Sequence, residues 1–194
     1  MKIGVLAFQG GVCEHINCIE KLGHCGVLVK TEKDLENIDG IILPGGESTT
    51  IGKLLNITGL MNPLRERIKN GLPVWGTCAG MIILAKNIED NEKNYLNLMD
   101  ITVKRNAFGT QIDSFKTLEK IECIGNTKME LVFIRAPYIT HIGKDVEVIC
   151  KVNDKIVAAK EKNMVVTSFH PELTSDLRFL EYFISLIKEN KNYN

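Results

Sequence analysis

Short apolar runs alternate with helix-like stretches through the first 85 residues, and this alternation constrains the fold most. Residues 2–8 are apolar and are followed by two glycines, which is typical of a buried strand. A helix is expected next, because apolar residues recur at helical spacing before Gly23. The pattern then predicts strands at 25–29, 39–43 and 72–75, and helices at 47–55, 63–70 and from 78 onward. Such alternation favours a parallel sheet covered by helices on both faces.

The second half of the chain is richer in strands. Strands are expected at 98–105, 115–124, 129–135 and 164–169, and a hairpin at 146–160 around Asn153-Asp154-Lys155. The last helix should begin near Thr174 or Ser175, and the polar tail from residue 188 should fray. We therefore expect a single domain over residues 1–194. Its fold class would be three-layer α/β, with a mostly parallel central sheet flanked by helices and an antiparallel extension or hairpin.

Composition excludes several classes of function. The 24 basic and 24 acidic residues cancel, so no net charge directs the chain to nucleic acid or to an anionic membrane. The longest apolar runs, such as residues 81–85, are too short to span a bilayer, and the start of the chain lacks a signal-peptide cleavage site. The six cysteines and four histidines show no metal-ligand spacing. We expect a cytoplasmic protein with reduced thiols, no metal and no cofactor.

Cys78 lies in Gly76-Thr77-Cys78-Ala79-Gly80, between an expected strand and an expected helix. Glycines on both sides allow the tight turn that exposes a nucleophile, as in Gly-x-Ser-x-Gly hydrolases. The helix N-terminus would favour a thiolate, and the Ala79 N–H would point to where an oxyanion forms. The alternative is a core cysteine between packing glycines.

A cysteine nucleophile needs a base, and His170-Pro171-Glu172 supplies one directly after a strand. In an extended backbone the side chains at positions i and i+2 face the same side, so the carboxylate could orient the imidazole. The alternative is an ordinary turn at a strand end with a solvated glutamate.

The third element is Pro44-Gly45-Gly46-Glu47-Ser48-Thr49, which also follows a strand. Glycines there let bare backbone approach a ligand and offer N–H groups. The stretch lacks the Lys-Ser/Thr ending of a phosphate-binding P-loop, so Gly46 as an oxyanion donor is the better interpretation. A tight turn with a helix cap at Ser48 or Thr49 is the alternative.

Together these motifs resemble the class I, triad-type glutamine amidotransferases, and more closely the family of glutaminase subunits of pyridoxal 5′-phosphate synthase. The resemblance covers essentially the whole chain and implies a flavodoxin-like fold. The stretches that narrow the match are Gln9-Gly10-Gly11-Val12-Cys13-Glu14-His15, residues 44–49, Arg105-Asn106-Ala107-Phe108-Gly109 and Phe133-Ile134-Arg135-Ala136-Pro137.

The resemblance implies hydrolysis of L-glutamine to glutamate and ammonia by Cys78 as nucleophile, His170 as base and Glu172 as its orienter. A barrel-shaped synthase subunit would receive the ammonia and make pyridoxal 5′-phosphate. The resemblance assigns substrate contacts to Gly46, Glu47, Ser48, Arg105, Ile134 and Arg135, and places Gln9, Glu14 and His15 near the edge where the synthase docks.

Other interpretations stay open at this point. The chain could serve another ammonia-channelling complex, such as imidazole glycerol phosphate synthase. It could also be a binding module with an unreactive Cys78, or a cysteine esterase or peptidase on the same type of turn.

Overall fold

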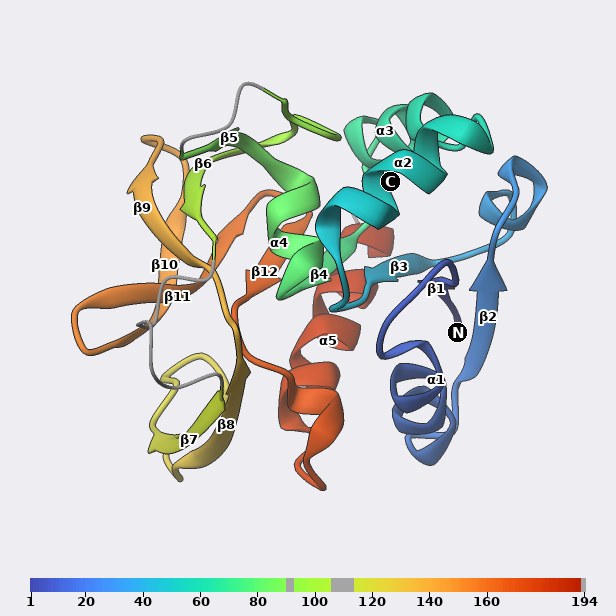
Figure 1. The fold of residues 1–194 in the computed structure, drawn as a ribbon. Helices are drawn as coiled ribbons and strands as arrows, with labels where there is room; N and C mark the ends of the chain where they lie inside the picture. Colours follow the sequence, from blue (N-terminus) through green and yellow to red (C-terminus); the bar gives the residue numbers. More distant parts are fainter. Residues whose placement is uncertain (90–92, 106–113, 193–194) are drawn as a thin grey trace.

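The computed structural model describes residues 1–89, 93–105 and 114–192 (Figure 1). The helices are α1 (Val12–Lys21), α2 (Ser48–Ile57), α3 (Met61–Lys69), α4 (Ala79–Leu84) and α5 (Arg178–Asn192), with short 3-10 turns η1 (Glu32–Leu35) and η2 (Pro171–Leu173). The strands are β1 (Lys2–Leu6), β2 (Cys25–Val29), β3 (Gly40–Leu43), β4 (Val74–Thr77), β5 (Ala85–Ile88), β6 (Met99–Lys104), β7 (Ser114–Glu119), β8 (Met129–Ile134), β9 (Tyr138–Ile142), β10 (Glu147–Val152), β11 (Lys155–Glu161) and β12 (Met164–Thr167).

One mixed sheet organises the fold, in the order β2-β1-β3-β4-β12-β11-β9-β6-β5, with β10 paired to β11. The pairs from β2 to β12 are all parallel, whereas β11 and β9 join antiparallel and extend the sheet. Strands β7 and β8 form a separate antiparallel ribbon. The expected fold class, a mostly parallel sheet with an antiparallel extension, is confirmed.

Helices cover both faces of the sheet (Figure 1). Strand β3 shows how the pleat divides its side chains: Ile41 and Leu43 join a cluster with α2, α3 and α4, while Ile42 joins a cluster with α1, α5 and the β7–β8 ribbon. Successive side chains of a strand point to opposite faces, so a strand buried on both faces is apolar throughout. This explains the unbroken apolar runs of the first half.

The hairpin predicted around residue 153 is confirmed. Strands β10 and β11 pair antiparallel, with Val152 opposite Lys155. Asn153 and Asp154 have φ of 50° and 62°, the left-handed conformations that a tight two-residue hairpin turn needs.

Strands β5 and β9 and both ends of helix α5 differ from the sequence prediction. The chain leaves α4 directly into β5, and β9 fills a stretch for which no strand was expected. Helix α5 begins only at Arg178 and then continues to Asn192 instead of fraying from residue 188. The Asn190 side chain donates to the Gly71 carbonyl, and Lys191 pairs with Asp39 at 2.7 Å, which ties this last turn to the body of the protein. Among the described residues, none of the helices has the length and apolar character required to cross a membrane.

Candidate active site

Cys78 occupies a sharp turn between β4 and α4. It has φ 48° and ψ −101°, a strained conformation for a residue with a side chain, and only 8% of it is exposed. A Cβ at Gly76 would lie 2.6 Å from the carbonyl of Gly80, and one at Gly80 would lie 2.0 Å from the carbonyl oxygen of Leu43. The two glycines therefore let α4 start directly against β3 and β4, which fixes the turn that carries the sulfur.

His170 and Glu172 meet beside this turn. The His170 Nδ1 lies 2.7 Å from Glu172 Oε1, and both side chains are largely buried. The backbone between them is not extended as expected, because Pro171 starts the 3-10 turn η2. The 3-10 turn still brings the Glu172 carboxylate next to the His170 imidazole. The predicted contact therefore forms, but with a different backbone conformation from the one expected.

The neighbours of His170 favour its protonated ring. Burial alone would lower the pKa of His170, but hydrogen bonding to Cys78 and to Glu172 outweighs burial and raises that pKa to about 10. Burial likewise opposes ionisation of Glu172, and the nearby His15 and His170 nevertheless lower the pKa of this carboxyl. The site therefore favours an imidazolium on a carboxylate, next to the Cys78 sulfur.

The glycine loop after β3 lies against the imidazole. A Cβ at Gly45 would be 2.3 Å from His170 Cε1, so only glycine allows this contact. The Gly45 N–H donates to Thr77 Oγ1 at 2.9 Å, and the Glu47 N–H donates to Gln9 Oε1 at 2.8 Å. Among the hydrogen bonds of the described residues, none uses the Gly46 N–H.

A cleft of about 460 Å³ lies over these groups. Arg105 reaches it from the end of β6 and donates from Nη2 to the Tyr95 hydroxyl at 3.0 Å, while its buried Nε has no partner among the described residues. The Ile134 carbonyl lies 3.9 Å from Cys78 Sγ. The predicted site residues that line this cleft are Gln9, Glu14, Gly46, Glu47, Ser48, Cys78, Ala79, Arg105, Ile134, Arg135, His170 and Glu172.

His15 is the one predicted site residue that the structure places elsewhere. Gln9 and Glu14 are exposed at the cleft, but His15 is only 1% exposed and lies behind Glu172, with Nε2 3.6 Å from Oε2. Its ring packs edge-on against Trp75. Helix α1 turns this side chain inward onto β4 and away from the exposed rim of the cleft. Residues 106–109, which contributed to the resemblance, lie outside the described residues.

With this geometry in place, comparison with known proteins identifies the family. The model of the SNO glutamine amidotransferase family matches residues 5–189.

The chain belongs to the SNO glutamine amidotransferase family.

Similar proteins extend this result. A relative in Clostridium beijerinckii, named pyridoxal 5′-phosphate synthase subunit PdxT, is 68% identical over 184 residues, covering 95% of this chain and 97% of the relative. A protein of the same name in Clostridium acetobutylicum is 58% identical over 186 residues, covering 96% and 100%. A crystal structure of a glutamine amidotransferase matches with a TM-score of 0.91 at 41% identity, covering 96% of this chain and 98% of that one. The resemblance drawn from the sequence is confirmed for the family and the fold.

Two side chains of this glutamine amidotransferase site were missed by sequence reasoning. Thr77 accepts the Gly45 N–H, and Tyr95 holds Arg105. Thr77 lies inside the motif around Cys78, so its position in the sequence could have identified it as a candidate site residue. Tyr95 lies ten residues before Arg105 in a stretch without regular structure, and no sequence pattern pointed to it.

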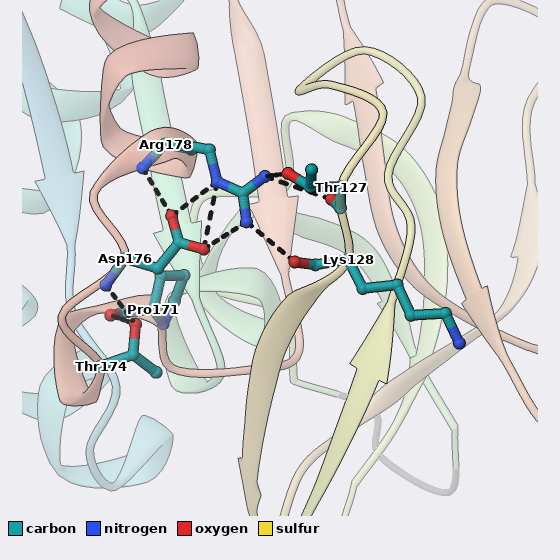
Figure 2. A network of polar contacts seen from close by, with 6 residues as sticks. All are labelled: Thr127, Lys128, Pro171, Thr174, Asp176 and Arg178. Carbon is teal, nitrogen blue, oxygen red and sulfur yellow. Dashed lines mark hydrogen bonds and ion pairs between the residues drawn. The ribbon is translucent and has the colours of Figure 1, made fainter.

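A polar network links η2 and the start of α5 to the loop between β7 and β8 (Figure 2). Arg178, at the start of α5, binds the Asp176 carboxylate and the backbone carbonyls of Thr127 and Lys128. Thr174 donates to the Pro171 carbonyl and accepts from the Asp176 N–H. These bonds connect the end of η2, the turn that contains Glu172, to the loop between β7 and β8.

Proposed function

We propose that this chain is the glutaminase subunit of a pyridoxal 5′-phosphate synthase and hydrolyses L-glutamine with a Cys78-His170-Glu172 triad. The observation that carries the proposal is that Cys78, His170 and Glu172 line one cleft, with His170 Nδ1 2.7 Å from Glu172 Oε1. The family of the chain and the names of its relatives support glutamine as substrate and this synthase as partner. The names of the relatives favour pyridoxal 5′-phosphate synthase over imidazole glycerol phosphate synthase as the recipient of ammonia.

Substrate binding uses the rim of the cleft. The guanidinium of Arg105 suits the α-carboxylate of glutamine, because it can bond both oxygens at once. Glu47 precedes α2 and Ser48 begins it, beside the glycine loop, whereas Ile134 ends β8 and Arg135 follows it. These groups would hold the two ends of glutamine so that its side-chain amide lies over Cys78.

The chemistry follows from the triad. The Cys78 thiolate attacks the amide carbon, and the N–H groups of Gly46 and Ala79 stabilise the oxyanion. The His170 imidazolium gives its proton to the departing ammonia as the C–N bond breaks, leaving a thioester on Cys78. A water molecule, deprotonated by His170, then attacks the thioester and releases glutamate. Glu172 keeps the imidazole oriented through both steps.

The reaction also explains why a partner is needed. Free ammonia released into water becomes ammonium at neutral pH and loses its nucleophilicity. A synthase subunit docked over the cleft, near the exposed Gln9 and Glu14, would receive ammonia before it escapes.

Cys78→Ala tests the proposal. In the complex with the synthase subunit this variant should release no measurable glutamate from glutamine, because no other group can form the thioester. Glutamate release is measured with and without the synthase subunit, and the exposed Cys25→Ala serves as the matched control. Glutamate release that survives Cys78→Ala would refute the mechanism. Turnover of simple esters with indifference to glutamine would identify an esterase instead.

A further inference from the structure

His15 is a buried polar side chain for which the reaction described above has no use. It projects from α1 toward β4 and is 1% exposed. Its Nε2 lies 3.6 Å from Glu172 Oε2 and 3.4 Å from Thr77 Oγ1. Polar groups are costly to bury without hydrogen-bond partners. A buried imidazole that faces two other buried polar groups is therefore expected to form hydrogen bonds with them.

Glu172 has one oxygen engaged and one that needs a donor. Its Oε1 accepts from His170, whereas Oε2 is buried and has no hydrogen-bond partner among the described residues. Buried carboxylate oxygens are nearly always hydrogen-bonded, because an unpaired one keeps its full desolvation cost. His15 Nε2 is a nitrogen within 4 Å of this oxygen, and a shift of well under 1 Å would bring the two atoms into hydrogen-bond range.

The surroundings of His15 determine which ring nitrogen carries its proton. The charged and titratable groups that act on it are Glu172 and His170 across the interface and Glu14 on its own helix. Burial is the largest influence and lowers the pKa of His15, so the ring is neutral at pH 7. A neutral ring carries one proton, and a lone pair on Nε2 would face the carboxylate. The proton therefore belongs on Nε2, where it points at Glu172.

The same nitrogen connects the triad to the oxyanion loop. Thr77 Oγ1, 3.4 Å from His15 Nε2, accepts the N–H of Gly45. Gly45 in turn packs on the His170 ring and precedes Gly46, the proposed oxyanion donor. His15 thus lies where a small movement of α1 would reach both the carboxylate and the glycine loop.

We propose that His15 is a positioning residue that donates its Nε2 proton to Glu172 Oε2 when the site is loaded, and so holds the carboxylate under His170. The role rests on the proposed glutaminase function. His15 touches neither substrate nor sulfur, so it acts only through Glu172 and the loop.

Two substitutions separate this role from simple packing. His15→Leu fills the space without a donor, and His15→Gln offers an amide N–H at a reach similar to that of Nε2. In the complex with the synthase subunit, His15→Leu should lower kcat about tenfold, the effect of losing one hydrogen bond to a charged group. Its KM for glutamine should change little. The acid limb of the kcat/KM profile should move to higher pH, because Glu172 loses a hydrogen-bond donor that favours its charged form. His15→Gln should recover most of the rate and the native acid limb.

Ile19→Val is the control, because Ile19 is buried on the same helix, packs in the apolar cluster with α5 and does not line the cleft. It should match the native kcat and pH profile. The proposal is overturned if His15→Leu keeps the native kcat and acid limb, or if the leucine and glutamine variants lose activity equally with an unshifted profile. Either outcome leaves the glutaminase function intact as long as Cys78→Ala is inactive, so the two hypotheses fail separately.

Discussion

The charge on His170 depends on groups that only the folded chain brings together. In the unfolded chain its imidazole titrates near the ordinary value of 6.5, and in the folded chain Cys78 and Glu172 raise the pKa to about 10 despite burial. A raised pKa means that the folded state binds the proton more tightly than the unfolded state does. The interaction of protonated His170 with its neighbours therefore stabilises the protein, and it does so in a defined pH range.

The sign of this effect gives a prediction. The stabilisation is fully present below pH 6.5 and is lost as pH rises toward about 10. Glu172→Gln removes the carboxylate and should return the His170 pKa toward its ordinary value. The free energy of unfolding should fall between pH 6.5 and 10 in both proteins, and it should fall further in the native chain. The difference between the two falls should be at least about 1.4 kcal/mol, the free energy that corresponds to a pKa shift of one unit. Urea denaturation at several pH values measures how steeply the free energy of unfolding depends on pH in each protein.

The lowered pKa of Glu172 does not confuse this comparison. A depressed carboxyl pKa contributes stability that is lost only as pH falls below its ordinary value of 4.5, outside the range used. Parallel slopes for the native chain and Glu172→Gln would contradict the charge state assigned to His170.

The sequence allowed some residues of the candidate site to be predicted and not others. Cys78, His170 and Gly46 belong to motifs whose local chemistry suggests a role, and all three line one cleft. Their roles remain proposals until tested. The burial of His15 depends on how α1 packs on β4. The hydrogen-bond partner of Arg105 depends on the position of Tyr95 in the folded chain. Such contacts join residues far apart in the chain or in irregular stretches, so sequence periodicity carries no information about them.

At the scale of elements, most predicted strands and helices of the described chain form, and the exceptions have physical causes. Strand β5 continues directly from the apolar run of α4, so no turn residue marked a boundary. Strand β9 is short and mostly half-buried or exposed. The end of α5 is polar, and its order comes from contacts with Gly71 and Asp39 that the sequence pattern could not show. Long-range pairing overrides weak local preference in each case.

Arg178 illustrates such long-range support, and it can be tested. Its planar guanidinium binds the Asp176 carboxylate and two backbone carbonyls of the β7–β8 loop together (Figure 2). A lysine ammonium cannot match this fork geometry. Arg178→Lys should lower the free energy of unfolding by about 1 kcal/mol, near the net contribution of a hydrogen bond whose partners water can reach. Because η2 loosens with it, kcat for glutamine should fall as well.

Chemical denaturation and glutamate release measure the two effects of Arg178→Lys. Arg67→Lys is a matched control, because Arg67 is exposed on α3. It should change stability by no more than about 0.5 kcal/mol, as is usual for surface substitutions. If both variants behave alike, the network of Figure 2 does not support the triad.

At the scale of the whole molecule, the candidate site gathers where parallel strands end. Cys78 follows β4, the glycine loop follows β3, and His170 follows β12, all neighbours in the sheet. In parallel α/β sheets, ligands bind at the carboxyl ends of the strands, because loops from adjacent strands converge there. This is why motifs far apart in sequence could be assigned to one site before their contacts were known. A single domain over residues 1–194 stays a prediction.

The rim of the cleft should be the surface that the synthase subunit covers. Two apolar side chains are left open there: Ile134 is 37% exposed and Leu173 is 46% exposed, beside the exposed Gln9 and Glu14. Burying a leucine side chain completely contributes about 1.5–3 kcal/mol, so covering a half-exposed one is worth roughly a factor of ten in affinity. Leu173→Ser should therefore weaken binding of the synthase subunit about tenfold. It should reduce the glutaminase rate at limiting synthase and preserve most of it at saturation.

A second leucine provides the comparison. Leu28 is 52% exposed on β2, at the opposite edge of the sheet from the strands that carry the antiparallel extension, and it does not line the cleft. Leu28→Ser removes the same side chain from a comparable exposure, so its effect on folding should be similar while the affinity for the synthase subunit stays native. Titrating the glutaminase rate against synthase concentration gives both affinities. Equal affinities for the two variants would mean that the partner does not dock over the cleft, and the ammonia would then need a path that starts elsewhere on the molecule.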